Sequence, residues 1–195
     1  MTSINVNRKR FTIEEYHRLI ELDFLTKSDR VELIRGELMQ MAAKGTPHSV
    51  CTTRLVRDLI ILLQKRAVLR SQEPITLPPN SEPEPDITIA RNRSDDYLLG
   101  HPSFEDIILI AEVSDSTLKY DQEEKLSLYA ESGIKNYWIF NLVSICLEIY
   151  TRPYQNLQGK FDYASKQVFL PNAVVNIPEF PDLSLDLSEI FPKNS

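Results

Sequence analysis

Two acidic residues with strand-like surroundings carry the strongest chemical signal in this sequence. Asp86 begins the segment 86–90, and Glu112 lies near the end of the apolar run 107–113. Two carboxylates that lie side by side at a sheet edge repel each other unless a positive charge lies between them, and hard divalent cations prefer such oxygen ligands. The pair therefore predicts metal-assisted hydrolysis.

The first half of the chain predicts two helices and a hairpin that could position these acids. Thr12 and Glu15 form a capping-box pattern, which predicts a helix over 13–22. Apolar and polar residues nearly alternate over 31–41 on either side of Gly36, as in a β-hairpin. Pro47 suits the first turn of a longer helix, in which apolar residues recur at helical spacing up to residue 63.

The second half predicts a sheet. Strands are expected at 68–77, 86–90, 107–113, 135–141 and 145–150, with a loop over 91–106. Pro74 marks the first of these strands as an edge or a bulge. Asp121 is expected to cap a helix that ends at Gly133, and the tail from Gly159 predicts short strands and a final helical turn near 187–191. The order describes an α/β fold in which a mixed sheet has a helix on each side.

Length and composition fit one globular domain. The chain has 195 residues, of which 42% are hydrophobic and 26% charged, so we expect a single domain over 1–195 with its core at about 47–141. The net charge of −6 divides into +5 for residues 1–70 and −11 for residues 71–195. A basic first third beside an acidic remainder is compatible with nucleic acid approaching from one side, and a solvated helix face explains the basic residues equally well.

Other classes of protein are disfavoured. The longest apolar stretches fall far short of the roughly 20 residues that span a membrane, and the first ten residues show no secretory signal. We therefore expect a cytoplasmic protein. Cys51 and Cys146 are too far apart in sequence to indicate a zinc site or a disulfide framework. A glycoside hydrolase would need two carboxylates about 5 to 9.5 Å apart beside sugar-stacking aromatics, and no such aromatic cluster is evident.

The sequence resembles a known nuclease family in six blocks that occur in the same order. These blocks are 32–37 in the hairpin, 47–49, Pro85-Asp86, 112–117, 124–130 and 133–138. They are similar to the Uma-two family within the PD-(D/E)XK nuclease superfamily. The resemblance implies a restriction-endonuclease-like core with an N-terminal helix and hairpin and a C-terminal β extension.

The resemblance also implies a site. Mg²⁺ or Mn²⁺ would be held by Asp86, Glu112 and the backbone carbonyl of Val113. Ser114 stands where the superfamily motif has a lysine. In this family, Lys125 on the following helix looks like the substitute, since residues 121, 125 and 129 are spaced to share one helix face. Without the family resemblance, a surface ion pair between Asp121 and Lys125 would be the preferred interpretation.

Three further residues are candidates for substrate binding. His48 could contact a phosphate together with the helix N-terminus, which attracts anions, or it could be a polar residue near a cap. Glu32 and Glu37 flank Gly36 in the hairpin, where either could supply a ligand or hold a basic partner. Regular alternation would instead leave Glu32 in solvent.

These observations favour a metal-dependent endonuclease that acts on DNA through Asp86, Glu112 and Lys125. The alternative is a catalytically inactive nuclease-fold module that binds nucleic acid or a protein partner, which the acidic net charge and the missing motif lysine favour to some degree. A homodimer would pair two sites for cutting both strands, and the sequence identifies no interface.

Overall fold

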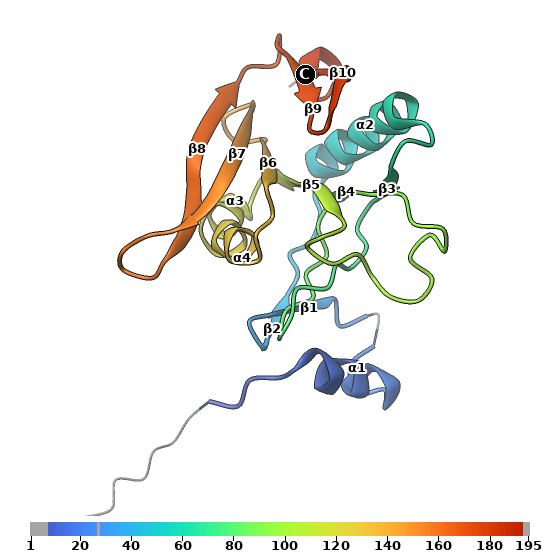
Figure 1. The fold of residues 1–195 in the computed structure, drawn as a ribbon, viewed down its shortest axis with the longest axis vertical. Helices are drawn as coiled ribbons and strands as arrows, with labels where there is room; N and C mark the ends of the chain where they lie inside the picture. Colours follow the sequence, from blue (N-terminus) through green and yellow to red (C-terminus); the bar gives the residue numbers. More distant parts are fainter. Residues whose placement is uncertain (1–7, 27, 193–195) are drawn as a thin grey trace, which may run out of the picture.

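The computed structural model describes residues 8–26 and 28–192, and a six-stranded sheet lies at the centre of this part of the chain (Figure 1). The strand order is β3-β4-β5-β6-β7-β8. Strands β5 and β6 are parallel, and the other neighbouring pairs are antiparallel, so the sheet is mixed as predicted. The strands are β3 (Val68–Arg70), β4 (Ile87–Ala90), β5 (Ile107–Ser114), β6 (Asn136–Asn141), β7 (Cys146–Gln155) and β8 (Phe161–Phe169).

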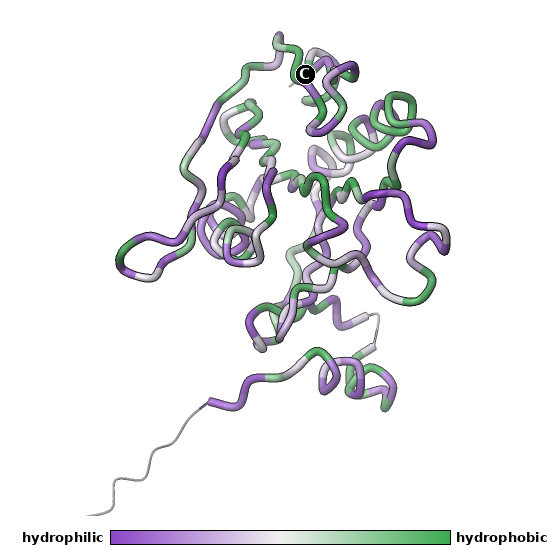
Figure 2. Tube along the Cα trace, in the orientation of Figure 1, coloured by the Kyte–Doolittle hydropathy of each residue, from purple (hydrophilic) through white to green (hydrophobic). Residues whose placement is uncertain are grey.

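Helices cover both faces of the sheet. Helix α2 (Thr46–Leu63) packs on one face through Cys51, Leu55 and Leu59. The other face carries a continuous helical segment made of α3 (Leu118–Tyr120), the π turn η1 (Asp121–Lys125) and α4 (Leu126–Glu131), which packs through a second apolar cluster. Hydrophobic residues accordingly gather on β5 and α2 in Figure 2. The expected helix on each side of the sheet is confirmed.

Strand β5 separates the two apolar clusters and is covered on both sides. All eight of its residues are buried, as a run of consecutive apolar residues predicts. Since successive side chains of a strand point to opposite faces, Leu109, Ala111 and Val113 join the cluster on the α2 side. Ile110 joins the cluster beneath α4, and Glu112 therefore points to the α4 side as well.

The N-terminal helix and hairpin form as the sequence predicts. Helix α1 (Ile13–Glu21) begins at a complete capping box between Thr12 and Glu15. Strands β1 (Val31–Ile34) and β2 (Glu37–Gln40) pair around Arg35 and Gly36, which both have positive φ. A side chain at residue 36 would lie 2.7 Å from the Arg10 Cβ, so the turn needs glycine for space as well as for backbone conformation.

The C-terminal part adds more to the main sheet than expected. Strand β8 has nine residues and pairs along β7, so the sheet continues well beyond residue 141. The hairpin of β9 (Val174–Ile177) and β10 (Phe180–Asp186) then packs beside α2. The 3-10 turn η2 (Leu187–Glu189) confirms the predicted final helical turn.

Two elements differ from expectation. The strand predicted at 68–77 ends at Arg70, because Gln72 has a positive φ and its backbone N–H donates to the carbonyls of Pro85 and Asp86 outside any ladder. The helix predicted to start at an Asp121 cap begins at Leu118, and Asp121 lies buried inside the π turn. Within the described ranges, no helix is both long and apolar enough to cross a bilayer.

Candidate active site

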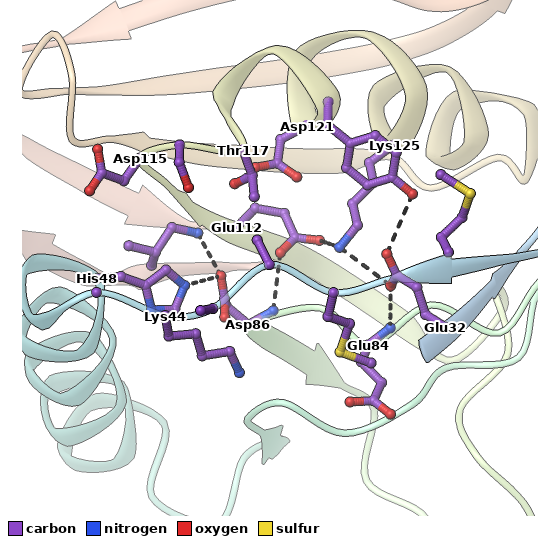
Figure 3. Close-up of a pocket in the computed structure, with 18 of the residues that line it drawn as sticks. Glu32, Lys44, His48, Glu84, Asp86, Glu112, Asp115, Thr117, Asp121 and Lys125 are labelled. Atoms are coloured by element: carbon purple, nitrogen blue, oxygen red, sulfur yellow. Dashed lines mark hydrogen bonds and ion pairs between the residues drawn. The ribbon is translucent and has the colours of Figure 1, made fainter. Parts of the chain in front are cut away.

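A cavity of about 310 Å³ lies between the hairpin, the start of α2, the adjoining ends of β4 and β5, and the segment from α3 to η1. Its walls carry two lysines, Lys44 and Lys125, together with His48. They also carry more acids than these cations can neutralise: Glu32, Glu84, Asp86, Glu112, Asp115 and Asp121. Figure 3 shows Glu32, Asp86 and Glu112 gathered near Lys125.

Strand register brings Asp86 and Glu112 together. Ile87 pairs with Ala111 in the antiparallel ladder of β4 and β5, so the residue before Ile87 lies beside the residue after Ala111. The Asp86 N–H donates to Glu112 Oε2 at 3.2 Å, and the Val113 N–H donates to Asp86 Oδ2 at 3.0 Å. Both carboxylates are buried. The two acids singled out in the sequence thus share one buried site.

Lys125 reaches this pair from the π turn. Its Nζ donates to Glu112 Oε1 at 3.0 Å and lies 3.6 Å from Glu32 Oε2. The Tyr129 hydroxyl donates to the same Glu112 oxygen at 2.9 Å. Lys125 is only 7% exposed, so this is a buried ion pair and not the surface pair with Asp121 that spacing alone would favour.

Ser114, which the sequence resemblance predicted to replace a motif lysine, has a structural contact. Its hydroxyl donates to Asp121 Oδ2 at 2.7 Å, and Thr117 donates to the same oxygen at 2.7 Å. The Tyr137 hydroxyl donates to the Asp121 carbonyl at 3.1 Å. This carbonyl lies in the π turn, where the backbone hydrogen bonds no longer follow the α-helical pattern. These contacts fix the π turn against the end of β5 and so hold Lys125 over Glu112.

Two further side chains contact the Asp86 carboxylate. His48 Nε2 lies 3.0 Å from Asp86 Oδ2, and the Gln72 amide donates to Asp86 Oδ1 at 3.3 Å. Helix α2 brings His48 to the cavity near its N-terminus, as the sequence suggested. A phosphate-binding role for His48 stays a prediction, and the contact that the structure gives it is with a carboxylate.

The two hairpin glutamates, Glu32 and Glu37, have different surroundings. Glu32 is buried at the cavity wall, where its Oε2 accepts the Glu84 N–H at 3.1 Å and lies close to Lys125. The expectation that Glu32 could be solvated is wrong, because the hairpin packs against the chain around Glu82 and Glu84. Glu37 does not line the cavity; it forms a partly exposed ion pair with Arg10 at 3.0 Å.

Burial and charge shift the pKa values of these acids in opposite directions. Burial raises the pKa of Glu112 to about 8, with Asp121 and Asp86 adding to the effect and Lys125 opposing it. Burial also raises the pKa of Asp86, but the contact with His48, the Val113 N–H and the charge of Lys125 outweigh it and hold this pKa below its ordinary value. Lys125 keeps a pKa well above its ordinary value, because the surrounding acids outweigh its burial. The site thus places Glu112, whose ionised form is destabilised, beside Asp86, whose ionised form is stabilised.

The donor set suits a hard divalent cation. Asp86 Oδ1 and Glu112 Oε2 each accept one hydrogen bond from the described residues, so each keeps a lone pair for a metal. No group of three or more His, Cys, Asp and Glu side chains that could hold a metal is found in residues 8–26 and 28–192. Mg²⁺ commonly binds through one or two carboxylates and completes its octahedron with water and phosphate oxygens, so two acids are enough.

Gln72, which contacts Asp86 from beside the cavity, and the cavity residues Lys44, Glu84 and Tyr120 had no assigned role in the sequence. Gln72 was placed in a strand, and no local pattern indicates the positive φ that turns its amide toward Asp86. Tyr120 donates to Glu32 Oε1 at 3.4 Å across 88 residues. Lys44 and Glu84 could have been suspected from their closeness in sequence to His48 and Asp86.

Comparison with known proteins identifies the family and supports the fold. The sequence matches the model of the Uma2 family, described as putative restriction endonuclease, over residues 13–188. A crystal structure of a putative nuclease belonging to DUF820 from Anabaena variabilis has a TM-score of 0.67 and 17% sequence identity, covering 93% of this chain and 97% of that chain. No curated protein matches the sequence. Family and fold indicate a restriction-endonuclease-like nuclease, and the chain belongs to the Uma2 family.

Proposed function

We propose that this protein is a metal-dependent endonuclease that hydrolyses phosphodiester bonds of DNA. The observation that carries the proposal is the contact between Lys125 Nζ and Glu112 Oε1 at 3.0 Å, in the same buried site as Asp86. Lys125 thereby places an ammonium group in the site, whereas the sequence has Ser114 at the motif position. A buried lysine beside two acids and an open cavity matches the needs of phosphoryl-transfer chemistry, which relies on positioning and electrostatic stabilisation.

Asp86, Glu112 and the Val113 carbonyl are the proposed ligands of Mg²⁺ or Mn²⁺. When bound, the metal lowers the pKa of a coordinated water and neutralises charge on the phosphate. His48 and Gln72 orient the Asp86 carboxylate, and Tyr129 orients Glu112. The Lys125 ammonium stabilises negative charge that develops on the phosphate or orients the attacking water.

Plasmid nicking in the presence of Mg²⁺ or Mn²⁺ tests the proposal. Asp86→Asn should lower the nicking rate by about a thousandfold, and Lys125→Met by about a hundredfold, because each removes charge from the site. Ser114→Ala should retain activity, since Thr117 still holds Asp121. Asp96→Asn is the matched control, as Asp96 lies exposed in the loop before β5 and does not line the cavity.

Calorimetric titration with Mn²⁺ separates metal binding from cleavage. The wild type and Asp96→Asn should bind the ion, and Asp86→Asn should bind it at least tenfold more weakly, because a neutral amide replaces a charged ligand. Equal nicking by Asp86→Asn and wild type, with both folded, would contradict the proposed site. Nucleic-acid binding without cleavage or metal binding would indicate an inactive nuclease-fold module instead.

A further inference from the structure

A second cavity of about 520 Å³ adjoins the acidic one. The two cavities share Met41, Lys44 and Glu84 as lining residues, so they meet along one boundary. Gln72 lines the second cavity and donates to Asp86 in the first, which places the second cavity directly behind the proposed metal ligand. A chain-like substrate held at Asp86 and Glu112 could therefore continue into this second cavity.

Two cations meet at the second cavity because of the hairpin. Arg30 precedes β1 and Lys44 follows β2, so strand pairing brings them to the same open end. The Met41 N–H donates to the Arg30 carbonyl at 2.8 Å, and Arg30 Nη2 donates to the Ala42 carbonyl at 3.3 Å. Both cations are exposed and line the cavity.

Neither cation has an acidic partner within the described ranges. The ion pairs found there include neither Arg30 nor Lys44, whereas the nearby Glu73 lies 3.7 Å from Arg70. Burial lowers the pKa of Lys44, Asp86 opposes this shift, and the charge of Arg30 lowers it further, so the two cations act on each other. Two like charges that share a cavity favour an anion between them.

The rest of the second cavity suits a nucleoside. Besides the acids Glu73 and Glu84, its wall includes Tyr16, Ile20 and Leu25 from α1 and the following loop, and Pro74. Apolar and aromatic surface can bury a sugar or a base, whereas an isolated inorganic anion would gain nothing from it. The Lys44 side chain lies on the side of Asp86 nearer to Glu84, which also lines the second cavity, and away from Lys125 (Figure 3).

We propose that Arg30 and Lys44 bind the phosphate next to the one that is cut, on the same nucleic-acid strand. This inference rests on the proposed function, because it places the cut phosphate at Asp86 and Glu112. The acidic cavity then receives one phosphate with its metal, and the second cavity receives the neighbouring phosphate and its nucleoside. The protein thus engages at least two consecutive phosphates of one strand.

Oligonucleotides with one and two phosphates test the inference. Binding of dTpdT and dTpdTpdT is measured by calorimetry at low salt with Ca²⁺ in place of Mg²⁺, so that the oligonucleotides stay intact, and KM is measured for both with Mn²⁺. In the wild type, the second phosphate should improve affinity by about tenfold, as expected for hydrogen bonds to a charged group. In Arg30→Ala this gain in affinity should fall to roughly twofold, the statistical factor for a ligand with two equivalent phosphates. Arg30→Lys should restore part of the gain.

Arg152→Ala is the matched control, because Arg152 is also exposed, also has a positive φ, and lines neither cavity. It should keep the tenfold gain. With a longer single strand, Arg30→Ala should reduce the slope of log K against log salt concentration by about 0.7, as loss of one phosphate contact predicts. The slope should not change in Arg152→Ala.

Each outcome separates this inference from the proposed function. If the wild type gains nothing from the second phosphate, or Arg30→Ala keeps the full gain, the inference is wrong even where cleavage is observed. If no oligonucleotide is cleaved but the gain in binding is present and depends on Arg30, the protein binds two consecutive phosphates as inferred, and the endonuclease proposal fails.

Discussion

Two buried glutamates of the same sheet make a direct comparison possible. Glu112 on β5 and Glu148 on β7 both pair with Ile139 on the intervening strand β6, so they lie in one row on the same face. Glu112 is 3% exposed and Glu148 is 4% exposed. Each also interacts with one lysine and at least one tyrosine hydroxyl.

Their surroundings nevertheless shift their pKa values in opposite directions. Burial raises the pKa of Glu148, but hydrogen bonds from Lys166, Tyr150, Asn141 and Gln122 outweigh it and lower the value to about 2. Burial raises the pKa of Glu112 to about 8, and two neighbouring acids add to the shift. The difference lies in the neighbouring charges: hydrogen-bond donors outweigh burial at Glu148, whereas Asp121 and Asp86 add to the effect of burial at Glu112 despite its own donors.

The comparison teaches how a structural carboxylate can be told from a candidate catalytic one. Glu148 has its charge satisfied by the protein, and its contact with Gln122 ties the π turn to the sheet. Glu112 faces a cavity with an excess of acids, which is the arrangement that a divalent cation stabilises. Perturbed acids in a cleft are candidates for function for this reason.

The largest expected difference between the two residues is in activity. Glu112→Gln should lower the nicking rate by about a thousandfold, because the amide neither holds the cation nor pairs with Lys125. Glu148→Gln should lower the rate by less than about tenfold, since it acts on the site only through the position of the π turn. Initial nicking rates with Mn²⁺ measure both. Losses of similar size would remove the distinction between the two glutamates.

The next effect is on the free energy of unfolding. Glu148→Ala should cost about 3 kcal/mol in the free energy of unfolding, because it leaves Lys166 and several buried donors without their acceptor. Urea unfolding measures this loss. Glu123→Ala, an exposed glutamate on the same π turn, should stay within about 0.5 kcal/mol of wild type. A loss for Glu148→Ala no larger than that control would show that the network is not stabilising.

The third effect, at most about 1.4 kcal/mol for each pH unit, is in the pH dependence of stability without divalent cations. The pKa of Glu148 falls from 4.5 to about 2 on folding, so the unfolded chain binds more protons in that window. Its stabilisation is present above pH 4.5 and is lost as pH falls toward 2. The pKa of Glu112 rises from 4.5 to about 8, so the folded chain binds more protons, and this contribution is lost as pH rises from 4.5 through 8.

Unfolding free energies at pH 5 and pH 8 in the presence of a chelator test the second window. Glu112→Gln cannot titrate at this position, so it should gain stability relative to wild type between the two pH values. Glu148→Gln should show no such gain, because its window lies below pH 4.5. A constant difference between Glu112→Gln and wild type would mean that Glu112 stays ionised throughout this range.

Local patterns predicted the elements well where one local rule dominated. The capping box at Thr12, the turn at Gly36 and the fully apolar run that became β5 each gave the element expected. Predictions failed where contacts from outside the segment decided the outcome. The strand after Arg70 stops because Gln72 bonds to the chain near Asp86, and Asp121 is buried because Ser114 and Thr117 hold it.

The sequence by itself determined the two acids, the strands that carry them and the family, since residue types and local periodicity are properties of short segments. Only the tertiary structure decided where the ammonium group lies. Lys125 could have paired with Asp121 in solvent, and the π turn together with the packing of α4 directs it to Glu112 instead. The same holds for Gln72, Tyr120 and the pairing of Arg30 with Lys44, because contacts between distant segments depend on strand register and packing, which no local pattern encodes.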